Sequence, residues 1–298
     1  MIRTLLLSLL LVSSSFAHDV IGYLPGYRVN PQTLAAVNQC TDVAYFGNTL
    51  AADGSIVLGD NADQHLQKIR ARIKQQTKAQ KTRLILCLGG WANDKHFPAV
   101  TATASKRKNF ALSLSKLTAK YQFDGVDLDW EYPKNNTQWL NLGKLVSEGK
   151  KALGKRPFIW SAAIASRHSI PAEVVNQLDR IHLMTYDAGK KHCHPAISKA
   201  AIADWKKRGV SVDKICIGAA FYGRNMKDRS DVKTYAQLLQ AHGKAAQTTP
   251  TAGGYFYDDP AACKRKRQLV LDYKLRGIIV WEIGQDAPGK DALLPLLK

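Results

Sequence analysis

The sequence predicts a single (β/α)8 barrel, and three observations support this fold. Short apolar segments that are rich in branched residues recur along the chain, as expected of parallel strands with both faces buried. Longer segments with helical periodicity lie between them. The length of 298 residues suits one closed α/β barrel. A doubly wound open sheet is the alternative fold, but no GxGxxG motif follows the first predicted strand.

Eight apolar runs are the predicted strands. They are apolar throughout rather than alternating between apolar and polar residues, which indicates burial on both faces. In chain order they are Val20–Leu24, Val43–Phe46, Leu84–Leu88, Gly125–Trp130, Pro157–Ala162, Ile181–Tyr186, Ile215–Ala220 and Gly277–Trp281. Because barrel enzymes place their active sites at the C-terminal ends of the strands, reactive side chains are expected where these runs end.

Helices are predicted in the polar–apolar stretches between the strands. Residues 63–75 and 105–121 each place their apolar side chains on one stripe. Further helices are predicted at 172–178, where Pro171 suits the first turn, and at 235–242 and 260–275. The basic run Lys264–Arg267 in the last of these segments is expected to be a solvated helix face.

The first 17 residues read as a secretory signal peptide. A single arginine precedes a leucine-rich run, and small residues follow before a predicted cleavage after Ala17. The apolar run is much shorter than the roughly 20 residues that a transmembrane anchor requires. The protein is therefore expected to be secreted, into the extracellular space or the periplasm. Residues 18–298 are expected to form one catalytic barrel domain that acts as a monomer.

The composition is basic, with 43 Lys and Arg against 24 Asp and Glu and a net charge of +19. Such a charge attracts anionic surfaces, so anionic cell-wall polymers are candidate partners, with solvated helix faces as the alternative explanation. No nucleic-acid-binding motif is visible, and no such partner is expected.

Cys193 lies between two histidines, but the spacing of a metal site is missing. Neither a metal nor another cofactor is therefore expected.

The fourth predicted strand carries the residues with clear chemical potential. Asp127, Asp129 and Glu131 are spaced by two residues, so their side chains share one face with about 6.6 Å between neighbouring Cα atoms. The opposite face is apolar and suits packing against helices: Val126, Leu128 and Trp130. The acidic face must then point into the barrel, where three carboxyls repel one another and titrate as a coupled set. Glu131, at the C-terminal end, is the expected proton donor.

This motif resembles the DxxDxDxE signature of glycoside hydrolase family 18, the chitinase family. Here it reads Asp-Gly-Val-Asp-Leu-Asp-Trp-Glu over residues 124–131. Other segments resemble further strand motifs of the family, in the same order along the chain. They are Ile21–Tyr23, Ala44–Phe46, Leu88–Trp91, Met184–Asp187, Gly218–Arg224, and Val280–Glu282 with Asp286. The resemblance thus covers the whole barrel.

The resemblance implies substrate-assisted, retaining glycoside hydrolysis, in which the 2-acetamido group of the sugar replaces a nucleophilic carboxylate. Glu131 would be the general acid and base. Asp129 would stabilise the oxazolinium ion, and Asp127 would share a proton from behind it. Tyr186 would orient the acetamide. Trp281 would form the floor under the −1 sugar. The other residues that the resemblance places in the pocket are Tyr23, Phe46, Trp91, Met184, Asp187 and Arg224.

The implied function is the secreted hydrolysis of β-1,4-linked N-acetylglucosamine polymers, either chitin or chito-oligosaccharides. The short stretch between Arg224 and Tyr255 indicates that the α+β insertion found after the seventh strand in many relatives is absent or much reduced. A shallower groove is expected in consequence. Two alternatives use the same chemistry, on peptidoglycan or on the chitobiose core of N-glycans. A third is a carbohydrate-binding barrel without activity, although lectins of the family have usually lost the acid at the position of Glu131.

Overall fold

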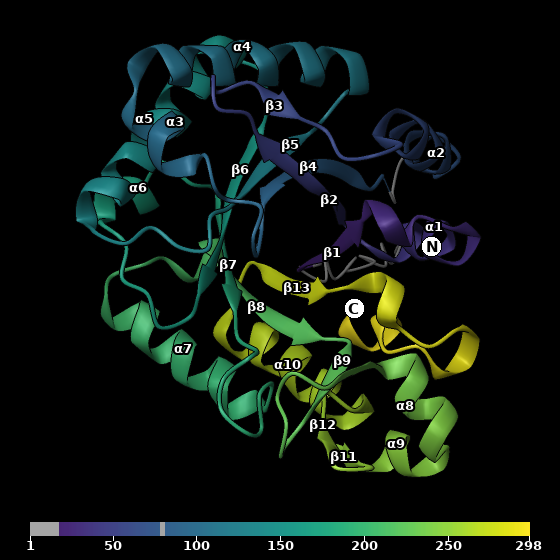
Figure 1. Cartoon of the computed structure of the whole chain (residues 1–298). Helices are drawn as coiled ribbons and strands as arrows, with labels where there is room; N and C mark the ends of the chain where they lie inside the picture. Colours follow the sequence, from purple (N-terminus) through teal and green to yellow (C-terminus); the bar gives the residue numbers. More distant parts are fainter. Residues whose placement is uncertain (1–17, 78–80) are drawn as a thin grey trace, which may run out of the picture.

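The computed structural model describes residues 18–77 and 81–298, so the predicted signal peptide lies outside the described residues. Its centre is a barrel of parallel strands (Figure 1). These strands are β1 (Asp19–Pro25), β2 (Asp42–Leu50), β4 (Arg83–Gly89), β5 (Gly125–Asp129), β6 (Ile159–Ala165), β7 (Arg180–Met184), β8 (Ile215–Ala220) and β13 (Gly277–Trp281). The last two have the predicted bounds, and the others differ from prediction by a few residues at their ends.

The pairing of the strands closes the sheet. The order is β1-β13-β8-β7-β6-β5-β4-β2, and β1 also pairs in parallel with β2. A further short strand, β3 (Ile56–Val57), extends β2 as an antiparallel hairpin. Sequential strands that pair in parallel around a closed ring define a (β/α)8 barrel. The predicted fold class is therefore confirmed.

Helices surround the barrel (Figure 1). They are α1 (Pro31–Ala36), α2 (Ala62–Lys74), α3 (Phe97–Ala102), α4 (Ala104–Tyr121), α5 (Asn136–Leu153), α6 (Ala172–Val175), α7 (Pro195–Lys207), α8 (Tyr235–His242), α9 (Lys244–Thr248) and α10 (Pro260–Tyr273). The helices predicted at 63–75, 105–121, 235–242 and 260–275 are present. The one predicted at 172–178 is shorter, because the chain leaves the α-helix after Val175.

Side-chain alternation along the strands separates two cores. The larger core lies between strands and helices and contains the apolar side of β5, including Val126 and Leu128. Trp130 belongs to it and stacks on Phe97, as the strand parity predicts. A smaller cluster fills the barrel interior, where residues such as Tyr23 meet side chains from the neighbouring strands. The acidic side of β5 therefore faces the interior.

The chain between β8 and α10 forms a small antiparallel sheet beside the barrel, with strand order β10-β9-β12-β11. Its strands are β9 (Tyr222–Asn225), β10 (Val232–Thr234), β11 (Thr251–Ala252) and β12 (Tyr255–Phe256). Helices α8 and α9 pack beside it (Figure 1). The stretch expected to hold at most a much reduced insertion thus forms only this small sheet and two short helices.

One expectation for the surface is wrong. Lys266, in the basic run predicted to be solvated, is fully buried on the inner side of α10. Its ammonium donates to Asp258 Oδ2 at 2.5 Å and to the carbonyl of Gly218 at 2.8 Å. A buried carboxylate and a backbone carbonyl on β8 provide the partners that a buried ammonium requires. None of the helices in the described ranges is long and apolar enough to cross a membrane.

Candidate active site

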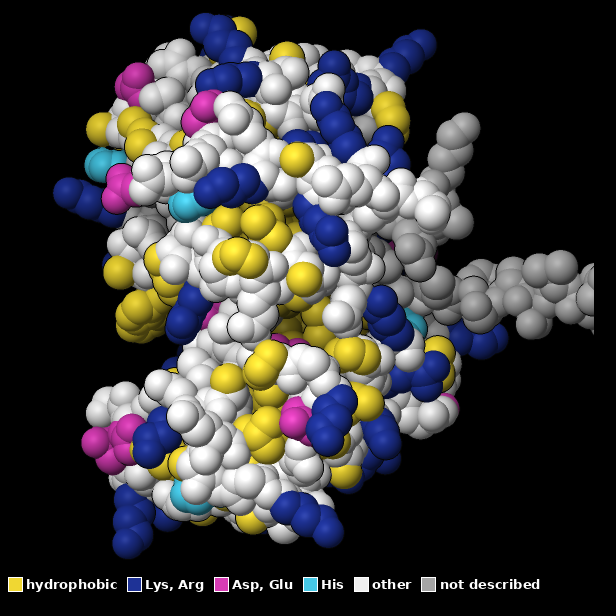
Figure 2. Space-filling view, turned by 90° about the vertical axis from the view of Figure 1, so that its right-hand side faces the viewer, with side chains coloured by type: hydrophobic (Ala, Val, Ile, Leu, Met, Phe, Trp, Pro, Cys, Tyr) yellow, Lys and Arg dark blue, Asp and Glu magenta, His cyan; other side chains and the backbone are white. Residues whose placement is uncertain are grey.

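A cavity of about 760 Å³ opens at the C-terminal ends of the barrel strands. Figure 2 shows a hollow in one face of the molecule, with hydrophobic side chains around it and acidic side chains within it. The lining residues come from almost every barrel strand or the loop after it. They are Tyr23, Tyr27, Phe46, Trp91, Asn93, Asp129, Glu131, Tyr132, Ala163, Ala165, Ser166, Arg167, Met184, Tyr186, Asp187, Ala188, Tyr222, Arg224, Val232, Trp281 and Gln285.

Asp127 lies below this cavity, fully buried inside the barrel. Its Oδ2 accepts a hydrogen bond from Tyr23 at 2.7 Å, and its Oδ1 accepts one from Ser161 at 2.6 Å. His182 Nδ1 is 3.0 Å from Oδ1. Burial by itself would raise the pKa of this carboxyl, but the charge of His182 and these hydrogen bonds outweigh it and lower the pKa. Asp127 is therefore held as a carboxylate.

Asp129 is the next residue on the same face of β5 and has the opposite electrostatic character. Burial raises its pKa well above the ordinary value, and the charges of Glu131 and Asp127 raise it further. Within the described part of the chain its Oδ1 has no hydrogen-bond partner. Gly90 lies beside this carboxyl and makes room for the ring of Phe46, since a Cβ there would lie only 2.3 Å from Phe46 Cε2. Asp129 is thus a carboxyl that readily keeps a proton.

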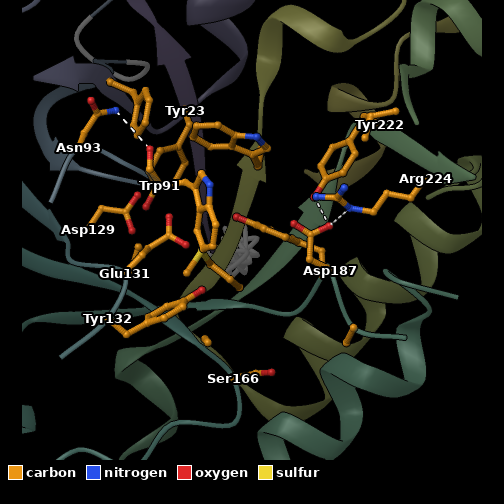
Figure 3. Close-up of a pocket in the computed structure, with 18 of the residues that line it drawn as sticks. Tyr23, Trp91, Asn93, Asp129, Glu131, Tyr132, Ser166, Asp187, Tyr222 and Arg224 are labelled. Atoms are coloured by element: carbon orange, nitrogen blue, oxygen red, sulfur yellow. Dashed lines mark hydrogen bonds and ion pairs between the residues drawn. The ribbon is translucent and has the colours of Figure 1, made fainter. Parts of the chain in front are cut away.

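Glu131 follows β5 and reaches the cavity beside Asp129 (Figure 3). Burial raises the pKa of its carboxyl, while hydrogen bonds from the Tyr132 hydroxyl and the Trp91 backbone partly oppose this effect. A carboxyl with a raised pKa at the edge of a cleft is suited to donate a proton and to recover it. Asp127, Asp129 and Glu131 are called the acidic triad below.

Tyr186 completes this part of the cavity. Burial raises the pKa of its hydroxyl far above the ordinary value, and the charges of Asp129, Asp187 and Glu131 act in the same direction. The phenol therefore remains protonated and can donate a hydrogen bond. Its ring packs over Gly218 of β8, where a Cβ would lie only 2.6 Å from Tyr186 Cε1. The absence of a side chain at Gly218 is what admits the ring.

Aromatic side chains provide flat apolar surfaces in the cavity. Trp281, at the end of β13, packs edge-on against Phe46 with ring centroids 4.9 Å apart and contacts Tyr23 at 5.7 Å. Trp91, after β4, is 77% exposed. Such surfaces are typical of sites that bind the apolar faces of sugars, with few polar groups to set the orientation.

Asp187 and Arg224 lie across the cavity from the acidic triad (Figure 3). They form an ion pair, and Tyr222 donates a hydrogen bond to Asp187 Oδ1 at 2.9 Å. His192 Nδ1 is 3.5 Å from the same oxygen. Loss of hydration in the cavity acts to raise the pKa of Asp187, but these contacts outweigh it and lower the pKa, although the side chain is 40% exposed. The arrangement fixes a carboxylate on this wall of the cavity.

The structure brings together most of the residues that the sequence predicts for the site. All of them line the cavity except Asp127, which lies directly beneath it. Several lining residues were not predicted, notably Tyr27, Tyr132 and Tyr222. Tyr27 and Tyr132 lie just after the ends of β1 and β5, so their positions next to strand ends could have identified them from the sequence. Within residues 18–77 and 81–298, no group of three or more His, Cys, Asp or Glu side chains is placed to hold a metal ion.

Comparison with known proteins identifies relatives over nearly the whole barrel. Residues 19–286 match the sequence model of the glycosyl hydrolases family 18. Endochitinase 1 of Metarhizium robertsii is 25% identical over 342 residues, an alignment that covers 90% of this chain and 80% of the relative.

Solved structures share the fold. A chitinase from Bacteroides thetaiotaomicron superposes with a TM-score of 0.82 at 19% identity, covering 94% of this chain and 95% of the other. A chitinase-like agglutinin from Robinia pseudoacacia superposes with a TM-score of 0.77 at 21% identity, covering 93% and 98%. One barrel architecture is therefore found in proteins described as enzymes and as agglutinins, and the chemistry must be argued from the site.

Proposed function

Since the chain belongs to the glycosyl hydrolases family 18 and is a glycoside hydrolase, we propose that it cleaves β-1,4 linkages between N-acetylglucosamine units with retention of configuration. One observation carries the proposal. Two carboxyls with raised pKa values, Asp129 and Glu131, share a cavity with the protonated phenol of Tyr186. An acid, an anion and an acetamide donor are the groups that substrate-assisted hydrolysis requires.

The first step breaks the glycosidic bond. The Glu131 carboxyl transfers its proton to the glycosidic oxygen, and the leaving sugar departs as an alcohol. The acetamide oxygen of the −1 sugar forms a new bond to the anomeric carbon, which gives a cationic oxazolinium ion. Tyr186 donates to that oxygen and holds it in line with the carbon, a proximity effect. The Asp129 carboxylate accepts the acetamide N–H and stabilises the positive charge.

The second step restores the enzyme. The Glu131 carboxylate removes a proton from water, whose oxygen attacks the anomeric carbon, and the bond to the acetamide oxygen breaks. Two inversions leave the configuration unchanged. Asp129 and Glu131 repel each other when both are charged, so together they tend to hold one proton. One proton is also what the two steps require, since Glu131 donates it in the first step and recovers it in the second. Before substrate binds, the proton is expected on Asp129; contact with the acetamide moves it to Glu131.

The aromatic walls support a chitin-type substrate. In this proposal Trp281, which lines the cavity at the end of β13, stacks under the −1 sugar. Trp91 offers a second apolar surface near Glu131 (Figure 3). The Metarhizium relative is named an endochitinase. We infer that chitin or chito-oligosaccharides are the substrate class. The remaining pocket residues of this proposal are Tyr23, Phe46, Met184, Asp187 and Arg224.

Peptidoglycan is the second candidate substrate, and the net charge of +19 favours it. A basic protein is attracted to an anionic cell wall, and peptidoglycan contains N-acetylglucosamine.

A binding role without activity is the third candidate, supported by the likeness to an agglutinin and opposed by the intact acidic triad. We also propose that the protein is secreted and that residues 18–298 are its mature catalytic domain.

A substrate panel tests the proposal. The purified chain is incubated with chito-oligosaccharides, colloidal chitin, peptidoglycan and a high-mannose glycopeptide, and proton NMR follows the anomeric configuration of the first product. Cleavage of chito-oligosaccharides with the β-anomer formed first is the expected result. If peptidoglycan or the glycopeptide is cleaved in preference, the proposed mechanism stands and the substrate assignment changes to that polymer. Formation of the α-anomer contradicts the mechanism, and binding without cleavage of any substrate contradicts the enzymatic function.

A further inference from the structure

One positively charged side chain on the cavity wall has no part in the proposed mechanism. Arg167 lines the cavity from the turn that follows β6, and it is exposed. Arg224, the other cation in the lining, is already paired with Asp187. None of the ion pairs within the described ranges involves Arg167. An arginine without a partner at a binding cavity is a candidate to bind an anionic group of the ligand.

The backbone around Arg167 is held in place beside the cavity. Residues 165–168 form a turn that is closed by a backbone hydrogen bond of 2.9 Å, with Arg167 as its third residue. The carbonyls on either side of Arg167 are both hydrogen-bonded. One accepts from the indole of Trp205 on α7 at 2.9 Å, and the other accepts from Arg208 at 2.7 Å. The position of Arg167 is therefore fixed, while its guanidinium remains available to a ligand.

The guanidinium of Arg167 acts on the wall that carries the proposed proton donor. The ring of Tyr132 packs edge-on against His168, with ring centroids 4.5 Å apart. Burial and the charge of Glu131 raise the pKa of the Tyr132 hydroxyl, and the positive charge of Arg167 opposes this effect. An anion bound at Arg167 would thus lie close to Tyr132 and Glu131.

Arg167 also lies away from the proposed floor under the −1 sugar. In the closed ring β6 is opposite β1, with three strands between them on either side. Ser166, the residue before Arg167, accordingly lies across the cavity from Tyr23, which contacts Trp281 (Figure 3). A sugar that stacks on Trp281 is therefore on the far side of the cavity. The guanidinium is placed for a neighbouring sugar of the same chain.

The other charges of the cavity disfavour an anionic ligand. Asp129 and Glu131 together tend to hold one proton, so the pair keeps one negative charge, and Asp187 is neutralised by Arg224. A carboxylate on the substrate would be repelled by that remaining charge unless a cation offset it. Chitin is neutral and offers Arg167 no partner. In peptidoglycan every second sugar carries a lactyl ether, which ends in a carboxyl group or in a peptide.

We propose that Arg167 is a specificity-determining residue that binds a carboxylate on the sugar next to the −1 position, so that the cavity prefers carboxylated N-acetylglucosamine glycans of the peptidoglycan type. This inference rests on the proposed function, since the linkage that is cleaved is the same. The planar guanidinium can donate two parallel N–H groups to both oxygens of a carboxylate. The net charge of +19 attracts the whole protein to the same anionic polymer.

Substrate discrimination tests this role. Three tetrasaccharides are compared: chitotetraose, a peptidoglycan tetrasaccharide with free lactyl carboxyls, and the same peptidoglycan tetrasaccharide after methyl esterification of those carboxyls. We expect the wild type to prefer the free acid over its ester. Arg167→Gln should lower the ratio of kcat/KM for acid and ester by about 10- to 100-fold, the usual effect of losing a hydrogen bond between charged groups. Arg167→Lys keeps the charge and should retain part of the preference.

Lys134→Gln is the matched control. Lys134 is exposed and lies two residues after Tyr132, but it does not line the cavity. It should leave the ratio as in the wild type. An equal fall of the ratio in Lys134→Gln would assign the preference to general attraction by the basic surface and overturn the inference. An Arg167→Gln chain that loses activity on all three substrates, with the ratio unchanged, overturns it as well.

Binding measurements decide the inference without turnover. Calorimetry compares the Glu131→Gln chain with the double variant Glu131→Gln/Arg167→Gln. We expect the second change to weaken binding of the free acid by about 10-fold or more and to affect the ester less. Equal affinity of both chains for the acid overturns the inference. A wild-type chain that cleaves none of the tetrasaccharides overturns the proposed function instead, while the affinities still decide whether Arg167 binds the carboxylate.

Discussion

The ring of Tyr186 occupies the space that Gly218 leaves open on the neighbouring strand. A Cβ at Gly218 would lie 2.6 Å from Cε1 and 2.8 Å from Cδ1 of that ring, and 3.0 Å from the backbone nitrogen of Thr185. Real Cβ atoms do not approach other heavy atoms so closely, and Tyr186 would have to move. The position of the phenol for which we propose the acetamide-orienting role therefore depends on a glycine on β8.

Gly218→Ala should lower kcat by about 10²-fold, because displacing a substrate-orienting group by about 1 Å has effects of that size. Steady-state hydrolysis of chito-oligosaccharides measures it, alongside thermal unfolding. Gly143→Ala is the control: it lies on α5, and its Cβ would meet the flexible end of Gln177 at 3.1 Å. Equal kcat values for the two variants would contradict the proposed role of the contact.

Glu131→Gln should lower kcat by about 10²–10⁴-fold, the usual effect of losing a general acid. An amide cannot donate the proton but has nearly the same shape, so oligosaccharide binding measured by calorimetry should persist. Glu148→Gln, on the helix surface of α5, should leave both quantities unchanged. Substantial turnover by Glu131→Gln would assign the proton donor to another group.

Asp129→Asn should lower kcat by about 10²–10³-fold, since in the proposed mechanism it removes the anion that stabilises the oxazolinium ion. A thiazoline analogue of N-acetylglucosamine, which resembles that ion, should inhibit the wild type competitively and the variant more weakly. If the analogue binds both proteins equally, Asp129 does not contact the acetamide nitrogen.

Trp91→Ala should impair the hydrolysis of longer oligosaccharides without destabilising the fold. Because Trp91 is 77% exposed, its truncation leaves little cavity in the core. The expected effect is a several-fold rise in KM for chitopentaose and a smaller one for chitobiose derivatives. Leu112→Ala removes another exposed apolar side chain, 59% exposed on α4, and should not change KM. An equal rise in KM for Leu112→Ala would mean that the loss of any exposed apolar side chain has this effect, and that Trp91 does not bind the substrate.

The sequence was sufficient to predict the barrel and the acidic triad because both depend on local patterns. Strand parity alone places Asp127 and Asp129 on the inner side and Val126 on the outer side of β5. Contacts between distant strands are different, since they depend on the register of the closed ring. The approach of His182 to Asp127, across β6, follows from that register.

Lys266 illustrates the same difficulty on a helix. Its neighbours in the sequence, Lys264 and Arg265, are exposed, and four consecutive basic residues suggest a uniform solvated face. Its burial depends on Asp258, whose carboxylate lies behind β8 and also accepts the backbone N–H of Ala220. Nothing in the local pattern distinguishes the one lysine that has a buried partner.

Lys266→Met should destabilise the protein by about 3–5 kcal/mol, because Asp258 would remain buried without its partner charge. Chemical denaturation measures the change in the free energy of unfolding. Lys264→Met, on the exposed side of the same helix, should change it by less than about 0.5 kcal/mol. Adding Asp258→Asn to Lys266→Met should recover part of the loss, since the uncompensated charge is then removed. A Lys266→Met variant as stable as Lys264→Met would mean that the buried ion pair makes no net contribution to stability.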